Sequence, residues 1–158
     1  MPKAVLLSIQ PKWCELIASG KKTVEVRKTK PNLPTPFKCY IYCTKGFKPN
    51  TPYSYKTWAG CGQVMGEFVC DTIITDKTFG HDALFKAAAC MSDAEIAAYC
   101  INPEMYGWHI SDLVIYDKPK ELSEFHQCHK CGYMGSCNNT CWNPLKRPPQ
   151  SWCYVEEV

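Results

Sequence analysis

The hydrophobic positions of the first 28 residues change period twice, which predicts a strand, a helix and a second strand. Residues 5–9 form a short apolar run of strand type. A helical pattern then begins at Pro11 and ends before Gly20, a residue type favoured just after a helix C-terminus. Residues 23–27 alternate, with valines on one face and polar side chains on the other. This last pattern predicts a half-buried strand.

The rest of the chain predicts further strands, separated by loops and by two helices. Strands are expected at 38–44, 63–75, 108–116 and 151–157, and helices at 82–91 and 92–100. Gly66 interrupts the longest strand and predicts a β-bulge, while Ser92 and Glu95 form the capping box of the second helix. Mostly antiparallel strands with inserted helices predict an α+β fold, a small closed or nearly closed β-barrel.

Length and composition predict one globular domain spanning residues 1–158. The chain is 46% hydrophobic and 21% charged, which is typical of a folded protein. Its first apolar run is too short for a signal peptide, and no run approaches the roughly 18 apolar residues of a membrane span. We therefore expect a cytoplasmic protein without a membrane partner, in which the twelve cysteines stay reduced.

The charge is distributed unevenly along the chain. Residues 1–60 carry eleven Lys or Arg and two acids, a balance of +9. Residues 61–158 carry seven Lys or Arg and thirteen acids, a balance of −6. A basic half predicts a positive surface for phosphate groups, as in RNA. The alternative is a solvated lysine-rich face with no ligand.

A motif at the helix-to-strand junction suggests a family. Residues 20–27 read GKKTVEVR and contain the spacing G-x-K-x-x-E-x-R. In this position the motif resembles that of the ASCH family, and the strand beginning at Gly66 and the terminal tryptophan-containing strand extend the resemblance over most of the chain. The resemblance implies a PUA-like β-barrel that acts on RNA or nucleotides.

The residues of this motif have the chemistry of a ligand site. The candidate binding residues are Gly20, Lys22, Thr23, Glu25 and Arg27. Glu25 and Arg27 share a strand face, where Arg27 offers a planar fork of donors and Glu25 an acceptor, with Lys22 in the adjoining turn. The alternative is a surface ion pair between Glu25 and Arg27, worth under about 1 kcal/mol.

Aromatic side chains elsewhere in the chain could add a stacking wall for a base. The candidates are Tyr40, Tyr42, Trp58 and Trp108. Any one of these residues is more often simply part of the core.

Three functions remain open from the sequence. The first is a module that binds RNA or a nucleotide. The second follows from a branch of small bacterial ASCH proteins, amidohydrolases that remove the acetyl group from N4-acetylcytidine with a lysine, a threonine nucleophile and a glutamate. Lys22 matches the lysine, but Glu25 stands at the threonine position, so the nucleophile does not carry over. The candidate catalytic residues are Lys22, Glu25 and Glu67, the lysine to polarise a carbonyl or act as a base and a glutamate to activate water. The third function is a protein-interaction module.

A cysteine-rich insertion at about 126–143 could provide that interaction surface and a metal site. Cys128, Cys131, Cys137 and Cys141 bring four thiols within fourteen residues. Two short-spaced pairs can direct four sulfurs to one tetrahedral centre, which predicts structural zinc. An iron–sulfur cluster or an unmetallated loop are the alternatives, and His126 or His129 could replace a cysteine.

Overall fold

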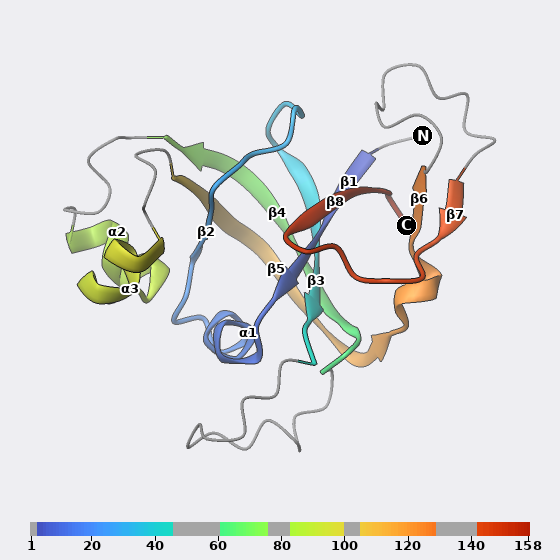
Figure 1. Cartoon of the computed structure of the whole chain (residues 1–158), viewed down its shortest axis with the longest axis horizontal. Helices are drawn as coiled ribbons and strands as arrows, with labels where there is room; N and C mark the ends of the chain where they lie inside the picture. The colour runs from blue at the N-terminus through green and yellow to red at the C-terminus, as the bar shows by residue number, and fades with distance from the viewer. Residues whose placement is uncertain (1–2, 46–60, 76–82, 100–104, 129–141) are drawn as a thin grey trace.

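A curled six-stranded sheet forms the centre of the protein in a computed structural model, which describes residues 3–45, 61–75, 83–99, 105–128 and 142–158 (Figure 1). Its strands are β1 (Lys3–Ile9), β2 (Val24–Arg27), β3 (Phe37–Cys43), β4 (Val64–Ile74), β5 (Tyr106–Lys120) and β8 (Trp152–Glu156). They lie in the order β2-β5-β4-β3-β1-β8, with β1 and β3 parallel and the other neighbours antiparallel. The mixed sheet curls into a half-barrel, in agreement with the α+β fold that the sequence predicts.

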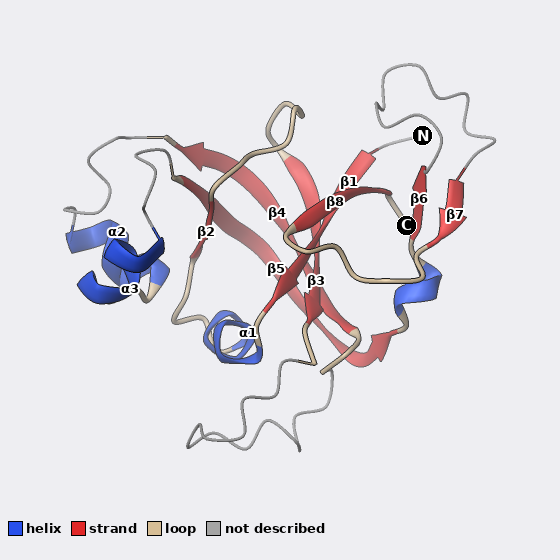
Figure 2. Cartoon of the chain, in the orientation of Figure 1, coloured by secondary structure: helices blue, strands red, loops and turns tan. Residues whose placement is uncertain are grey.

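Helices lie at two places around this half-barrel (Figure 2). Helix α1 (Pro11–Ala18) follows β1 directly, while α2 (Ala83–Ala89) and α3 (Asp93–Tyr99) lie beside β2. The 3-10 helix η3 (Leu122–Glu124) precedes a separate pair of short antiparallel strands, β6 (His126–Cys128) and β7 (Trp142–Pro144). Within the parts of the chain described, no helix has the length and apolar character needed to cross a membrane.

Both faces of the central strands are buried, because side chains alternate between two clusters. On β1, Val5 and Leu7 enter the cluster that also holds residues of α1 and Trp108. Ala4 and Leu6 point the other way, into a cluster closed by Phe125 beyond η3. The sheet is therefore a packed layer between two cores.

Strand β2 departs from the sequence prediction of a half-buried strand, since all four of its residues are buried. The predicted alternation is correct. Val24 and Val26 pack against a third cluster that includes Phe85 of α2. Glu25 and Arg27 face the other way, and both are less than 10% exposed. Burial on this polar face excludes the surface ion pair that the sequence left open.

Most predicted elements are present with shifted ends. The pairing of β4 with β5 shifts in register next to Gly66, where the sequence predicts a bulge, and a Cβ on Gly66 would clash with the carbonyl oxygen of Val114. The capping box is also confirmed, since Ser92 N donates to Glu95 Oε2 at 2.8 Å and Glu95 N donates to Ser92 Oγ at 3.2 Å. The sequence did not predict β6 and β7, which are only three residues each.

The predicted stacking wall is wrong for the aromatic residues that the structure describes. Tyr40, Tyr42 and Trp108 are at most 4% exposed and belong to the two cores. Trp108 packs edge-on to Phe37, with ring centroids 5.6 Å apart. Trp58 lies outside the described residues.

Candidate functional site

The turn between α1 and β2 positions the motif lysine. Gly20 has a φ of +76°, a left-handed conformation that favours glycine, although a Cβ there would meet no atom within 4 Å. The backbone then folds back on the helix, because Lys22 N donates to the carbonyl of Leu16 at 3.0 Å. Gly20 thus acts through the backbone, and its predicted role in ligand binding is not tested.

Thr23 connects this turn to two other elements. Its N–H donates to the carbonyl of Ala88 at 2.8 Å, and its carbonyl accepts from Ile110 N at 2.9 Å. Its side chain is exposed, unlike those of its neighbours Lys22 and Val24. Thr23 therefore anchors the start of β2 between α2 and β5.

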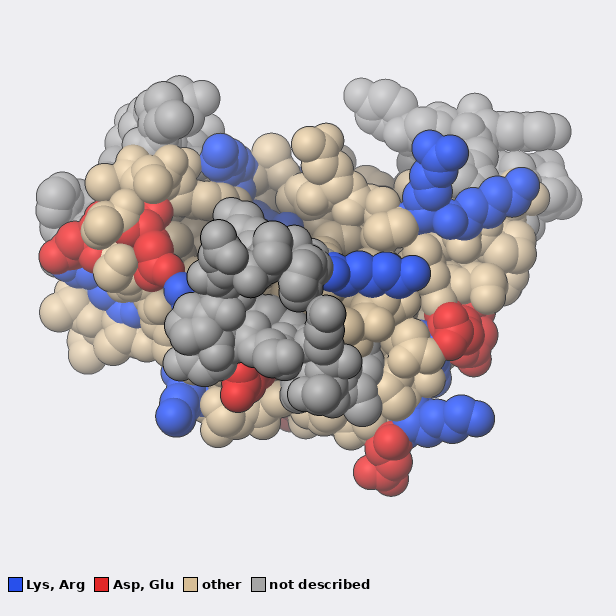
Figure 3. All heavy atoms as spheres, turned by 60° about the horizontal axis from the view of Figure 1, so that its bottom comes forward, with Lys and Arg blue, Asp and Glu red and all other residues tan. Residues whose placement is uncertain are grey.

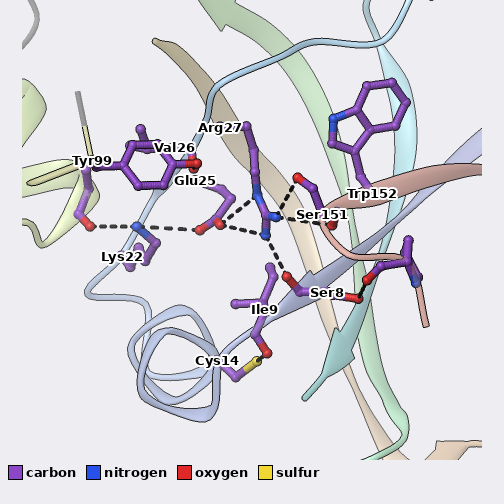
Figure 4. Close-up of polar contacts among 12 residues, drawn as sticks. Ser8, Ile9, Cys14, Lys22, Glu25, Val26, Arg27, Tyr99, Ser151 and Trp152 are labelled. Carbon is purple, nitrogen blue, oxygen red and sulfur yellow. Dashed lines mark hydrogen bonds and ion pairs between the residues drawn. The ribbon is translucent and has the colours of Figure 1, made fainter. Parts of the chain in front are cut away.

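Lys22, Glu25 and Arg27 come together in one buried row (Figure 4). The Lys22 amine lies 3.5 Å from Glu25 Oε2, and Arg27 Nη2 lies 2.9 Å from Glu25 Oε1. Their side chains are 2%, 7% and 9% exposed. The motif therefore forms a charge network in which one carboxylate lies between two cations.

Arg27 connects this network to the backbone of other elements. Its Nε donates to Glu25 Oε1 at 3.1 Å and its Nη2 to the carbonyl of Ser8 at 2.9 Å. Its Nη1 donates to the carbonyl and hydroxyl of Ser151, at 3.1 and 3.2 Å. Because β2 and β8 are the two edge strands of the sheet, Arg27 bridges the open side of the half-barrel. Every nitrogen of its guanidinium is engaged within the protein.

Lys22 is the chemically unusual member of the row. Its amine donates to the carbonyl of Ala89 at 2.6 Å and lies 4.7 Å from the centre of the Trp13 ring. Burial lowers the pKa of Lys22, and the nearby Glu25 carboxylate offsets only part of that effect. A lysine in this environment loses its proton more readily than one on the surface.

Trp108 lies beside the carboxylate. It is directly opposite Glu25 in the pairing of β2 with β5, and it is fully buried. Its indole Nε1 has no hydrogen-bond partner in the part of the chain that the structure describes. A buried donor without a partner carries a desolvation cost, and such groups are rare in folded proteins.

Glu67, the third candidate catalytic residue, lies in a different cluster. Its carboxylate accepts a hydrogen bond from Tyr116 and pairs with Lys38 at 3.2 Å. Burial tends to raise its pKa, but the hydrogen bonds from Tyr116 and Lys38 outweigh this effect and leave the pKa lowered. Glu67 pairs in register with Tyr40, which belongs to the core on the opposite face of the sheet from Trp108. The structure thus joins Glu25, and not Glu67, to Lys22.

Folding pairs several of the basic residues of the first half with acids. Lys12 pairs with Glu95 at 2.6 Å, and Lys38 pairs with Glu67 and Glu157. On the face in Figure 3, Lys and Arg side chains are spread among Asp and Glu instead of forming one patch. Among the described residues on this face, the charge asymmetry of the sequence therefore does not produce a uniformly basic surface.

Two exposed lysines follow the motif directly. Lys28 lies 4.9 Å from the centre of the Tyr99 ring, and Lys30 lies 5.8 Å from that of Tyr106. The loop between them is anchored through Thr29, whose hydroxyl accepts from Trp152 Nε1 at 2.9 Å. These contacts hold two positive charges in a fixed loop next to the buried row.

The cysteine-rich segment lies largely outside the described residues. These exclude Cys131, Cys137 and Cys141, whereas the backbone of Cys128 pairs with Trp142 in the β6–β7 hairpin. The hairpin therefore joins the two ends of the segment. Among the residues described elsewhere in the chain, no group of three or more potential ligands could hold a metal. The zinc site stays a prediction.

Sequence reasoning missed the partners that hold the row in place. Ser8 and Ser151 bind Arg27 mainly through backbone carbonyls, which leave no signature in a sequence. Trp13 lies beside the Lys22 amine, a contact that the helical pattern beginning at Pro11 does not predict. Its spacing from the motif, on the helix that ends at Gly20, is the one signal that could have suggested the contact.

Comparison with known proteins gives the family. No curated protein matches the chain significantly. Among solved structures, the crystal structure of ASCH from Zymomonas mobilis has a TM-score of 0.65 at 19% identity, covering 98% of this chain and 88% of that one. The crystal structure of a serine-to-alanine mutant of that protein has a TM-score of 0.64 at 20% identity, covering 98% of this chain and 89% of that one. These likenesses show the fold. The ASCH domain description matches residues 7–110, most of the chain and the whole of the buried row. The chain therefore belongs to the ASCH domain family.

Proposed function

We propose that the protein binds RNA or a nucleotide and that Lys22 and Glu25 contact the bound base. The observation that carries this proposal is the buried pair itself, a lysine and a carboxylate 3.5 Å apart with side chains only 2% and 7% exposed. Together they offer a donor and an acceptor in a nonpolar environment, where hydrogen bonds to a base edge are strong. The membership of the ASCH family supports the same class of ligand.

Arg27 has a supporting role in this proposal. Its guanidinium nitrogens already bind Glu25, Ser8 and Ser151, so it orients the carboxylate instead of meeting the ligand. Lys28 and Lys30 are better placed for phosphate groups, since they are exposed and adjacent in sequence to the row. Such contacts supply affinity without base specificity.

Fluorescence anisotropy with a short single-stranded RNA and with cytidine monophosphate tests the proposal. We expect RNA affinity to fall steeply with added salt, and the double variant Lys28→Ala/Lys30→Ala to flatten that dependence. We expect Lys22→Met to weaken the binding of both the RNA and cytidine monophosphate, because the nucleotide also contacts the buried pair. Lys38→Met is the matched control, a lysine–glutamate pair outside the row. Equal losses for Lys22→Met and Lys38→Met would refute the site, and salt-independent binding would refute the phosphate contacts.

A second candidate is hydrolysis of an N4-acylated cytidine, and the lowered pKa of Lys22 favours it. Burial is the cause of this shift, and a lysine whose pKa is lowered gives up its proton more readily and can then accept one from a substrate or water. Glu25 lies at hand to orient a water molecule. Release of acetate from N4-acetylcytidine, lost in Lys22→Met and retained in Lys38→Met, would establish the activity. Binding of the nucleoside without turnover would leave only the first function.

We also propose that Cys128, Cys131, Cys137 and Cys141 hold a structural zinc ion. The β6–β7 pairing supports this by joining the two ends of the segment that carries these cysteines. Four thiolates leave no open coordination position, so the metal would stabilise the fold and take no part in a reaction. Protein purified without a polyhistidine tag should contain about one equivalent of zinc, lost in Cys128→Ser/Cys131→Ser. Protein with no metal after purification under reducing conditions would contradict the proposal.

A further inference from the structure

Three cysteines from separate parts of the chain meet near the end of β3. Cys14 comes from α1, Cys43 from the last residue of β3, and Cys61 from the turn before β4. The Sγ atoms of Cys43 and Cys61 are 3.6 Å apart. Cys14 and Cys43 are fully buried and Cys61 is half-buried, so solvent reaches this group of thiols at Cys61.

The backbone holds Cys61 against Cys43. Gly62 N donates to the carbonyl of Cys43 at 2.7 Å, and Cys43 N donates to the carbonyl of Gln63 at 3.0 Å. Gly62 and Gln63 therefore both lie opposite Cys43, as in a β-bulge whose first residue is glycine. Gly62 has a φ of +84°, which other residues rarely adopt. The closeness of the two sulfurs is thus built into the strand pairing.

We propose that Cys43 and Cys61 form a modification site, a dithiol that hydrogen peroxide converts reversibly into a disulfide. The sulfurs need to approach by about 1.5 Å to reach the bond length of a disulfide, which a small rotation of either side chain provides. Cys14 stays a thiol in this reaction, because its Sγ is directed at the carbonyl of Ile9, 3.5 Å away.

The environment favours Cys43 as the attacking sulfur. The neighbouring Cys14 sulfur lowers the pKa of Cys43, and the Cys61 sulfur adds to this effect, so that together they outweigh the opposite effect of burial. Burial and the same contact raise the pKa of Cys61 to about 12. Cys43 is thus the sulfur of the pair that loses its proton more readily, and the thiolate is the reactive form.

The reaction is balanced with peroxide as the only added reactant. The Cys43 thiolate attacks one oxygen of hydrogen peroxide, the O–O bond breaks and hydroxide leaves, which gives a sulfenic acid. Cys61 then attacks that sulfur, the S–S bond forms and a second hydroxide leaves. The two thiol protons convert both hydroxides to water, and the two sulfurs supply the two electrons that reduce the peroxide.

The disulfide would tie the end of β3 to the turn that enters β4. Seventeen residues separate the two cysteines in the sequence, so the bond closes a loop that is long enough to restrict the unfolded chain. We expect the oxidised protein to unfold at a higher temperature than the reduced protein. Dithiothreitol should reverse the change.

Peptide mapping of the whole chain tests the proposal. The reduced protein is treated with hydrogen peroxide, its remaining thiols are alkylated, and it is digested without reductant. We expect a peptide that links Cys43 to Cys61, absent before peroxide and lost on reduction. Cys61→Ser should abolish the link, while Cys153→Ser, which removes another half-buried thiol, should leave it intact.

Mapping of the unaltered protein keeps the test decisive even if Cys61→Ser fails to fold. Irreversible oxidation of Cys61 without a link to Cys43 would overturn the proposal. So would a link from either cysteine to Cys14 or to the segment 128–141, or zinc bound by Cys43 and Cys61 in the purified protein.

Discussion

Two lysine–glutamate pairs on the same sheet show what burial does to similar chemistry. Lys22, in the turn before β2, and Glu25, on β2, lie in the buried row, with side chains 2% and 7% exposed. Lys38 and Glu67 lie on β3 and β4, with side chains 27% and 21% exposed. Both pairs have further polar partners, so the number of contacts does not distinguish them.

The pKa shifts of the two lysines run in opposite directions. Burial lowers the pKa of Lys22 despite the carboxylate beside it. Burial also acts to lower the pKa of Lys38, but the hydrogen bond and charge of Glu67 outweigh it and the pKa is raised. In the buried pair desolvation therefore outweighs the carboxylate, whereas in the partly exposed pair the carboxylate outweighs desolvation. The buried pair is the one in which the lysine more readily loses its proton.

The largest effect that we predict is that of Glu25→Gln. The substitution leaves Arg27 and Lys22 buried without a counter-charge, which costs about 3–5 kcal/mol of unfolding free energy. Urea denaturation followed by circular dichroism measures the loss. Glu67→Gln is the matched control on the exposed pair. If the two variants lost equal stability, burial would not be what separates the pairs.

Arg27→Lys should have the next largest effect. A lysine cannot reach Glu25, Ser8 and Ser151 at once, so about 1–3 kcal/mol of stability is expected to be lost. Hydrogen exchange should also rise at the Ser8 amide, which donates to the carbonyl of Ser151 at 3.0 Å. The control is Arg147→Lys, a change in the chain's other arginine, which is exposed. Unchanged exchange at Ser8 would show that Arg27 does not close the half-barrel.

The sequence predicted the composition of the row better than its environment. Alternation along residues 23–27 correctly set Glu25 and Arg27 on one face of β2 and the valines on the other. It could not show that both faces are covered, because the cover comes from helices α2 and α3 and from the sheet's distant strands. Burial of this kind depends on tertiary packing and has no local signal.

The sequence prediction that Glu67 acts together with Lys22 illustrates a second limit of reading a site from sequence. The face of a strand on which a residue lies depends on register, and one extra residue reverses it. The pairing of β4 with β5 shifts on both sides of Glu67, between Val64 and Gly66 and between Glu67 and Val69. Sequence predicted the bulge at Gly66 but not its effect on the partners of Glu67. These partners proved to be Lys38 and Tyr116.

Titration of the two lysines would sharpen the comparison directly. We expect NMR of the lysine side chains to show Lys22 titrating below the ordinary lysine pKa and Lys38 above it. For Lys22 the folded protein releases its proton before the unfolded chain does, so stability rises with pH across that interval. For Lys38 the ion pair contributes fully to stability at pH values below the pKa of the lysine in the unfolded chain. This contribution is lost as the pH rises through the pKa of Lys38 in the folded protein. Shifts of the same sign for both lysines would contradict the argument from burial.

The smallest effect that we predict is that of Glu67→Gln, within about 1 kcal/mol at neutral pH, since partly exposed ion pairs contribute little. The neutral amide still accepts a hydrogen bond from Tyr116, so only the ionic part of the interaction with Lys38 is lost. Because the pKa of Glu67 is lowered in the folded protein, its contribution is present above the unfolded pKa and disappears as the pH falls through the folded one. The variant and the unaltered protein should therefore converge in stability in acid, as measured by urea denaturation over a pH series. A difference in stability that persisted in acid would mean that Glu67 stabilises the sheet through packing and not through its charge. The exposed pair would then no longer serve as an electrostatic reference for the buried pair.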